Sequence, residues 1–320
     1  MANPSSLPWL FSALFNHRAV AAEAAGRTVF VFPWYGARWA DMAKEMLDSA
    51  PAFADEMQRC NTAFSEHLDW SLLDLVRDDT APTRRDGIDV RQPMSFAAMA
   101  SLAAQWRALG IHPDAVLGHS HGEIAAAYVA GGLSLRDATA VVVQRAVAVS
   151  ALAETGGMAV IAWPVDQVLA RIERWGQSIF VAAYNGPSST VVTGAAAAVD
   201  ELVTTLSRDG VPANRIPIAH ALHSAAIDDV QATLRESLSD LQPRPAEVRF
   251  ISSVTGAGLD TSILDADYWF ANLRQPVLFE QAVRWSHAHG YHTFVEASPE
   301  PVLTAGIQES LNGYSARTHA

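Results

Sequence analysis

A glycine-framed turn between a strand and a helix constrains this chain more than any other feature. Ala115 to Leu117 is typical of a short buried strand, and the segment 118–122, Gly-His-Ser-His-Gly, opens another helix. Glycines on both sides of Ser120 permit the strained turn of a nucleophile elbow, which projects the serine oxygen above a sheet at a helix N-terminus. We therefore predict that Ser120 is a nucleophile in an α/β fold. The alternative is a glycine-rich turn in which the serine is incidental.

A serine nucleophile needs a base, and the sequence offers two neighbouring histidines. His220 and His223 lie just after a predicted strand at 211–217. Elbow hydrolases place an acid and then a histidine downstream of the serine, but no convincing acid loop lies between Ser120 and this pair. A serine–histidine dyad is therefore more plausible than a triad. Taken alone, either histidine could instead be a structural core or capping residue.

The order of predicted elements indicates two domains. Beyond Glu154 the rhythm changes to β-α-β-β-α-β, which is typical of a ferredoxin-like unit. We expect this unit at 152–217, inserted into a large domain formed by 1–151 and 218–320, with the ligand site in the crevice between them. Strands are expected at 28–32, 115–117, 158–162, 179–183, 190–193, 211–217, 248–252 and 292–296, and helices at 39–47, 94–109, 165–175 and 195–208 and from residues 224, 279 and 301.

Composition excludes several classes of protein. The formal net charge is −12, without a basic cluster, which argues against nucleic-acid and anionic-membrane partners. No apolar run approaches the roughly 20 residues of a membrane-spanning helix, and residues 1–26 lack the pattern of a secretory signal, so we expect a cytoplasmic protein. Cys60 is the only cysteine, which excludes an intramolecular disulfide, and we expect no metal site.

Nine ordered motifs extend the argument beyond the elbow. They are Phe30 to Pro33, Arg91 to Pro93, Gly118 to Glu123, Ala130 to Leu135, Asn185 to Pro187, His220 to His223, Tyr268-Trp269, Asn272 to Val277 and Phe294 to Pro299. Together, over the range from about Arg27 to Ser310, they resemble the malonyl-CoA:acyl carrier protein transacylase family, especially the acyltransferase domains of polyketide synthases. The resemblance implies an α/β-hydrolase-like large domain with an inserted ferredoxin-like small domain.

The resemblance also implies roles at the reaction centre. Ser120 would carry the acyl group, His223 would be the base, and the main-chain carbonyl of Asn272 would hold the imidazole in its working tautomer. The oxyanion hole would consist of the backbone N–H groups of His121 and Tyr35, donors that are typically worth about 3 kcal/mol each.

Substrate contacts follow from the same resemblance. Arg145 matches the arginine that binds the free carboxylate of a malonyl-type substrate, a task for which a bidentate guanidinium is suited. The alternative for Arg145 is a surface position on its helix. The other residues expected against the substrate are Trp34, Gln92, His119, His220 and Leu222.

The implied reaction is a ping-pong acyl transfer, in which the acyl group, expected to be malonyl, moves from coenzyme A to the phosphopantetheine thiol of an acyl carrier protein. Both are substrates, and no bound cofactor is expected. We expect a discrete enzyme that acts in trans in polyketide biosynthesis, although an excised module of a larger synthase is also possible.

Several departures from the family pattern keep other hypotheses open. Trp34-Tyr35-Gly36 replaces the usual Gly-Gln-Gly, His121 stands where glutamine or an aliphatic residue is usual, and Leu222 stands where phenylalanine is usual. These changes suggest as an alternative the transfer of an unusual acyl, aminoacyl or peptidyl group between carrier proteins or onto a small-molecule hydroxyl. A second alternative is a serine hydrolase or thioesterase, because the elbow serves both chemistries. A catalytically inactive binding module is disfavoured by the presence of both Ser120 and His223.

Overall fold

The larger of two β-sheets is built from strands that are buried almost end to end. The computed structural model describes residues 26–34, 39–78, 87–312 and 317–319, and within them this sheet has the order β10-β9-β1-β2-β7-β8. Five strands are parallel and β8 pairs antiparallel with β7. Val29 to Phe32 are fully buried, as expected for a parallel strand covered on both faces. The strands are β1 (Arg27–Phe32), β2 (Ala115–Gly118), β7 (Arg249–Ser252), β8 (Ala257–Leu259), β9 (Tyr291–Glu296) and β10 (Arg317–His319).

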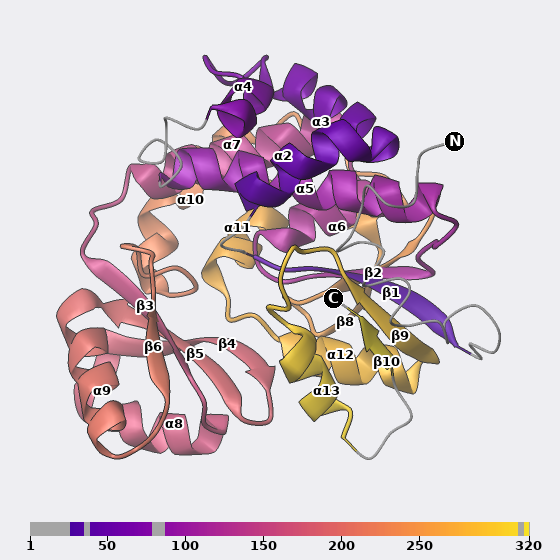
Figure 1. The fold of residues 1–320 in the computed structure, drawn as a ribbon. Helices are drawn as coiled ribbons and strands as arrows, with labels where there is room; N and C mark the ends of the chain where they lie inside the picture. The colour runs from indigo at the N-terminus through magenta and orange to yellow at the C-terminus, as the bar shows by residue number, and fades with distance from the viewer. Residues whose placement is uncertain (1–25, 35–38, 79–86, 313–316, 320) are drawn as a thin grey trace.

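Helices cover both faces of this sheet (Figure 1). On one face α6 packs against β1, β2 and β7, and α5 lies over α6, while α12 and α13 cover the other face. α5 is rich in alanine and serine, so its backbone can approach its neighbours closely, and most of its residues are buried. The helices are α2 (Trp39–Ser49), α3 (Pro51–Phe64), α4 (Leu72–Arg77), α5 (Ile88–Ala108), α6 (Gly122–Ala130), α7 (Leu135–Ser150), α10 (Gln231–Ser237), α11 (Ala266–Arg274), α12 (Phe279–Ala288) and α13 (Thr304–Ser310), with short 3₁₀ turns η4 (Ala225–Val230) and η5 (Thr261–Ile263).

The second sheet is antiparallel and has a hydrophobic cluster of its own. Its strands have the order β4-β5-β3-β6, and the chain passes through it as β-α-β-β-α-β. The buried cluster beneath it draws only on residues 159–213. The predicted boundaries at 151/152 and 217/218 stay a prediction. The elements are β3 (Gly156–Ile161), α8 (Val165–Ile172), η3 (Glu173–Ser178), β4 (Ile179–Gly186), β5 (Ser189–Ala195), α9 (Ala196–Arg208) and β6 (Ala213–Ile216).

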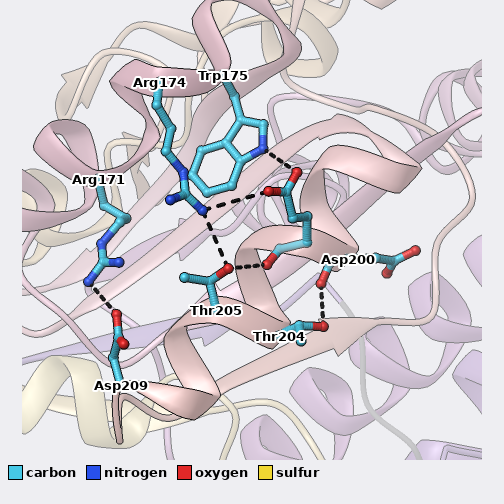
Figure 2. A network of polar contacts seen from close by, with 8 residues as sticks. Arg171, Arg174, Trp175, Asp200, Thr204, Thr205 and Asp209 are labelled. Carbon is cyan, nitrogen blue, oxygen red and sulfur yellow. Dashed lines mark hydrogen bonds and ion pairs between the residues drawn. The ribbon is translucent and has the colours of Figure 1, made fainter.

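Polar contacts join the two helical segments of this smaller unit (Figure 2). Arg171 forms an ion pair of 2.7 Å with Asp209, and the indole N–H of Trp175 donates to the Glu201 carboxylate at 3.0 Å. The Arg174 guanidinium lies 3.8 Å from the centroid of the Trp175 ring. Exposed pairs of this kind contribute about 1 kcal/mol or less each, so the buried cluster holds the unit together.

Backbone hydrogen bonds connect the smaller sheet to the segment after α11 and to the segment after β6. The N–H of Tyr184 donates to the carbonyl of Val277, whose own N–H donates to the carbonyl of Ala182, both at 2.9 Å. The N–H of Gly156 donates to the carbonyl of Ala219 at 2.9 Å. The bond between Gly156 and Ala219 helps to fix the segment that leads from β6 to His223. Within the residues described above, no helix is both long and apolar enough to cross a bilayer.

Candidate active site

The turn between β2 and α6 holds Ser120 in a strained conformation. Its backbone φ is +52°, in the left-handed region that residues other than glycine rarely adopt. The flanking glycines are required by close packing: a Cβ at Gly118 would overlap the backbone of Glu123, and one at Gly122 would overlap the carbonyl of Phe32. The structure therefore has the nucleophile elbow that the sequence predicts, with α6 directly against β1.

Ser120 and His223 lie within hydrogen-bonding distance of one another. The Oγ of Ser120 is 2.8 Å from Nε2 of His223, and Nδ1 of the same ring is 2.7 Å from the carbonyl oxygen of Gln275. Because a carbonyl can only accept, Nδ1 carries the ring proton and Nε2 presents its lone pair to the serine hydroxyl. This tautomer is the one that a general base requires.

The end of α11 fixes the position of His223. The backbone of His223 also has a positive φ, of +59°, and its N–H donates to the carbonyl of Leu273 at 3.1 Å. Only 4% of the residue is exposed. Burial lowers the pKa of the imidazole from its ordinary 6.5 to about 3, and the positive charge of Arg145 acts in the same direction. His223 is therefore neutral at physiological pH and free to accept a proton.

Arg145 reaches the nucleophile from α7. Its Nη2 donates to Ser120 Oγ at 3.1 Å, and its Nη1 donates to the side-chain oxygen of Asn272. Only 1% of the residue is exposed, so the surface alternative for Arg145 is wrong. Burial lowers the pKa of the guanidinium to about 10 and the charge of Glu123 opposes this shift, so Arg145 remains a cation at pH 7.

A buried carboxylic acid lies behind this arginine. Glu123 is fully buried and accepts hydrogen bonds from the backbone N–H of Ser253, from the Tyr268 hydroxyl at 3.0 Å and from the Asn272 amide at 2.6 Å. Burial raises its pKa to about 7, against the effect of these donors. The Asn272 amide thus bridges Glu123 and Arg145, and it also donates to the carbonyl of Ser120 at 3.2 Å.

A cleft of about 280 Å³ opens beside Ser120. Its lining includes Ser120 and Arg145, and four of the residues predicted to contact substrate, Trp34, Gln92, His220 and Leu222. A second, wider groove of about 670 Å³ has His223 in its wall, together with Tyr184 of β4 and Pro276. Ser120 and His223 therefore line two different cavities.

Comparison with known proteins identifies the family. The family model for the acyl transferase domain matches residues 29–319. This chain belongs to that family. Mycoketide-CoA synthase of Mycobacterium tuberculosis is 48% identical over 290 residues, which are 91% of this chain and 7% of that protein. The acyl transferase domain thus spans a small part of the curated relatives that it matches.

Solved structures of polyketide synthase acyltransferases have the same fold. The acyltransferase domain from module 8 of the salinomycin polyketide synthase has a TM-score of 0.87 and 48% identity, covering 95% of this chain and 75% of that chain. The loading acyltransferase of the avermectin modular polyketide synthase has a TM-score of 0.87 and 44% identity, covering 91% and 93% of the two chains. The fold of this acyl transferase domain is that of the polyketide synthase acyltransferases, with mixed α/β sheets.

One predicted role is corrected by the geometry. The carbonyl that holds the His223 imidazole belongs to Gln275 and not to Asn272. Asn272 lies inside α11 and serves through its side-chain amide, whereas Gln275 caps the helix in an extended conformation with ψ of 154°, so its carbonyl points away from the helix. The signal was present in the sequence: Pro276 follows, and the residue before a proline is pushed out of the helical region.

The expected contact between His119 and the substrate is not supported by the lining of the cleft. His119 is not among the residues that line it, because its Nε2 lies 2.8 Å from Asn185 Oδ1 of β4 and its ring packs against Phe279. His119 therefore helps to join the two sheets beneath the site.

Of the expected oxyanion donors, the N–H of His121 stands at the N-terminus of α6, where helix geometry leaves N–H groups without helical partners. Tyr35 lies outside the described residues.

Two contributors were not assigned a role by sequence reasoning. Gln275 supplies the carbonyl to His223, and Glu123 supports the bridge to Arg145. Glu123 belongs to a quoted motif, but only its complete burial distinguishes it from an ordinary helical glutamate. Among the residues with described positions, no group of three or more histidine, cysteine or acidic side chains could hold a metal ion.

Proposed function

We propose that this acyl transferase domain moves a malonyl-type acyl group from coenzyme A to the phosphopantetheine thiol of an acyl carrier protein, through an ester on Ser120. The observation that carries this proposal is the environment of a single oxygen atom. Ser120 Oγ lies 2.8 Å from the neutral base His223 and 3.1 Å from the buried cation Arg145. A base activates the oxygen, and the cation provides a partner for a carboxylate close to the reacting carbon.

The first half-reaction forms the seryl ester. Ser120 Oγ attacks the thioester carbonyl carbon while its proton passes to Nε2 of His223. The oxyanion that forms is stabilised by the N–H of His121 and, as the family resemblance implies, by that of Tyr35. The carbon–sulfur bond then breaks, and the proton on Nε2 goes to the departing coenzyme A sulfur. The Gln275 carbonyl stabilises the transient imidazolium because it accepts the hydrogen bond from Nδ1–H throughout.

The second half-reaction is the same sequence in reverse with a different thiol. His223 takes the proton of the carrier protein's thiol, the sulfur attacks the ester carbonyl, and the bond from the carbonyl carbon to Ser120 Oγ breaks. The proton then returns from Nε2 to Ser120 Oγ. No redox step or bound cofactor is needed, because one thioester is exchanged for another.

The two cavities suggest where the parts of the substrate lie. The cleft beside Ser120 and Arg145, at about 280 Å³, is at the low end of ligand pockets and suits a short acyl group better than a long acyl or peptidyl chain. The groove in whose wall His223 lies is wider and more open, and it has room for the thioester arm of either donor or acceptor. The sulfur would then sit between the two cavities, within reach of Nε2.

A two-protein transfer assay tests the proposal. The enzyme is incubated with malonyl-CoA, excess donor is removed, and a phosphopantetheinyl carrier protein is added as a separate chain. Intact-protein mass spectrometry should show malonyl first on the enzyme and then on the carrier protein. Release as free malonate without transfer would favour the hydrolase alternative. An enzyme adduct only from long or aminoacyl thioesters would favour the unusual-acyl alternative.

The same assay bears on two further proposals. Transfer between separate chains supports the trans-acting form, and failure with all separate carrier proteins would contradict it. A cytoplasmic location is likewise proposed, since malonyl-CoA and carrier proteins would both have to be accessible to the enzyme.

A further inference from the structure

Four side chains that line the acyl cleft each hold one buried polar atom that has no hydrogen-bond partner among the residues that the structure describes. These atoms are Gln92 Oε1, His121 Nδ1, Arg145 Nε and His220 Nε2. All four residues line the same cleft beside Ser120, and none is more than 8% exposed. Buried polar groups in native proteins are nearly always paired, so such a group of atoms around one cleft indicates a ligand that pairs them.

The hydrogen bond between His121 and Gln92 decides which of these atoms accept. Nε2 of His121 lies 3.0 Å from the main-chain carbonyl of Gln92, which also accepts from the Ser95 hydroxyl at 3.1 Å. A carbonyl cannot donate, so Nε2 carries the proton. Burial lowers the pKa of this imidazole to about 3, and the ring is neutral at pH 7. Nδ1 of His121 is therefore an acceptor, and Gln92 Oε1 is a second acceptor on a residue that lines the same cleft.

Arg145 presents the opposite polarity. Its Nε–H is a donor, and it is the natural partner of the carboxylate in the function proposed above. A carboxylate, however, can only accept hydrogen bonds, and a methyl or larger alkyl substituent can neither donate nor accept one. A plain malonyl or alkylmalonyl group would leave the two acceptors on Gln92 and His121 unpaired.

We propose that the acyl group selected by this cleft carries a hydroxyl group in addition to its carboxylate, as in a 2-hydroxymalonyl thioester. The carboxylate pairs with Arg145, and the hydroxyl donates to His121 Nδ1 or Gln92 Oε1. An amino substituent would also donate, but as an ammonium it would be repelled by the Arg145 cation, whose charge acts on His121 directly. His121, which stands where the family usually has glutamine or an aliphatic residue, is on this account a specificity-determining residue. The inference rests on the proposed acyl transfer through Ser120.

A matched pair of substrates tests the inference. The rate of Ser120 acylation is measured by intact-protein mass spectrometry with 2-hydroxymalonyl and 2-methylmalonyl thioesters of pantetheine, whose substituents are of similar size. We expect wild-type enzyme to prefer the hydroxyl compound by about tenfold or more in kcat/KM, the factor for one buried acceptor left unpaired. His121→Leu should reduce the preference towards unity, and Gln92→Leu should reduce it in part.

The control is Val147→Ala, at a mostly exposed position on the same helix as Arg145, which should keep the wild-type preference. Equal or faster acylation of the wild-type enzyme by the methyl compound would overturn the inference while leaving the proposed function intact. A preference that survived in both His121→Leu and Gln92→Leu would overturn the assignment of the acceptors. If no malonyl-type thioester acylated Ser120, the proposed function itself would fail, and the inference with it.

Discussion

Lowering the pH from about 7.5 to about 5.5 should destabilise the fold through three histidines that are buried in the neutral form. His119, His121 and His223 are each at most 4% exposed. Burial lowers their pKa values to about 4, about 3 and about 3, respectively. Because these folded-state values lie below the unfolded value of about 6.5, the unfolded chain binds more protons. The free energy of unfolding therefore falls as the pH decreases through about 6.5.

The size of the effect follows from these values. Across this pH interval each neutral histidine should lose about 1.4 kcal/mol of stability, or about 4 kcal/mol for the three. Glu123 acts in the opposite direction, because burial raises its pKa to about 7 and the folded state then holds a proton that the unfolded chain does not. Protonation of Glu123 should raise the free energy of unfolding by about 1.8 kcal/mol over the same interval. The four groups together should therefore lower it by about 2 kcal/mol.

Urea unfolding of wild type and His121→Gln at both pH values isolates one of these contributions. Glutamine does not titrate, so the variant should lose about 1.4 kcal/mol less than wild type between the two pH values, whatever its absolute stability. His67→Gln, at an exposed position on the surface, is the matched control and should follow wild type. An identical pH dependence of wild type and His121→Gln would refute the argument that this imidazole is buried neutral.

Three further predictions concern the reaction and its support. Arg145→Ala should reduce kcat/KM for malonyl-CoA by a factor that corresponds to about 2–5 kcal/mol of activation free energy, and its activity towards acetyl-CoA should rise relative to that towards malonyl-CoA. Val147→Ala should behave like the wild type. Equal losses for both donors would contradict a carboxylate-binding role for Arg145. Because the pKa of His223 is lowered to about 3, kcat/KM for seryl acylation should stay level from about pH 8 to about pH 5, and a sigmoidal loss centred near 6.5 would show a solvated histidine instead. Glu123→Ala should destabilise the protein by roughly 1–3 kcal/mol in urea unfolding, because it removes the acceptor of the Ser253 N–H and one of the acceptors of the Tyr268 hydroxyl and of the Asn272 amide; an unchanged midpoint would contradict this supporting role for Glu123.

Local patterns predicted the elements around the nucleophile well. The strand at 28–32, the strand at 115–117 and the turn at Ser120 depend on neighbouring residues alone, and the structure places β1, β2 and the elbow there. The β-α-β-β-α-β rhythm beyond Glu154 is likewise the order of elements in the smaller sheet. The helix expected from Ser224 is instead the 3₁₀ turn η4, followed by α10. Its buried residues Ile227 and Val230 are three apart, a spacing that matches the three-residue period of a 3₁₀ helix.

Contacts across long sequence separations were harder to predict. The sequence indicates a base near 220–223, but the bond from His223 to Gln275 depends on how α11 docks, 52 residues further along the chain. The resemblance pointed to the right motif and to the wrong residue within it, because Asn272 faces Arg145 and Glu123 through its side chain. The two unpaired acceptors on Gln92 and His121 depend on α5 and the elbow meeting side by side, which no local pattern reports.

Mapping the covalent intermediate shows which residue of the protein carries the acyl group. Wild-type enzyme and Ser120→Ala are incubated with malonyl-CoA, quenched in acid, digested and sequenced by tandem mass spectrometry. We expect a malonyl ester on Ser120 in the wild type and no adduct in the variant, whose circular dichroism should match that of the wild type. A malonyl group on another residue, or an undiminished adduct on Ser120→Ala, would contradict the claim that this serine carries the acyl group.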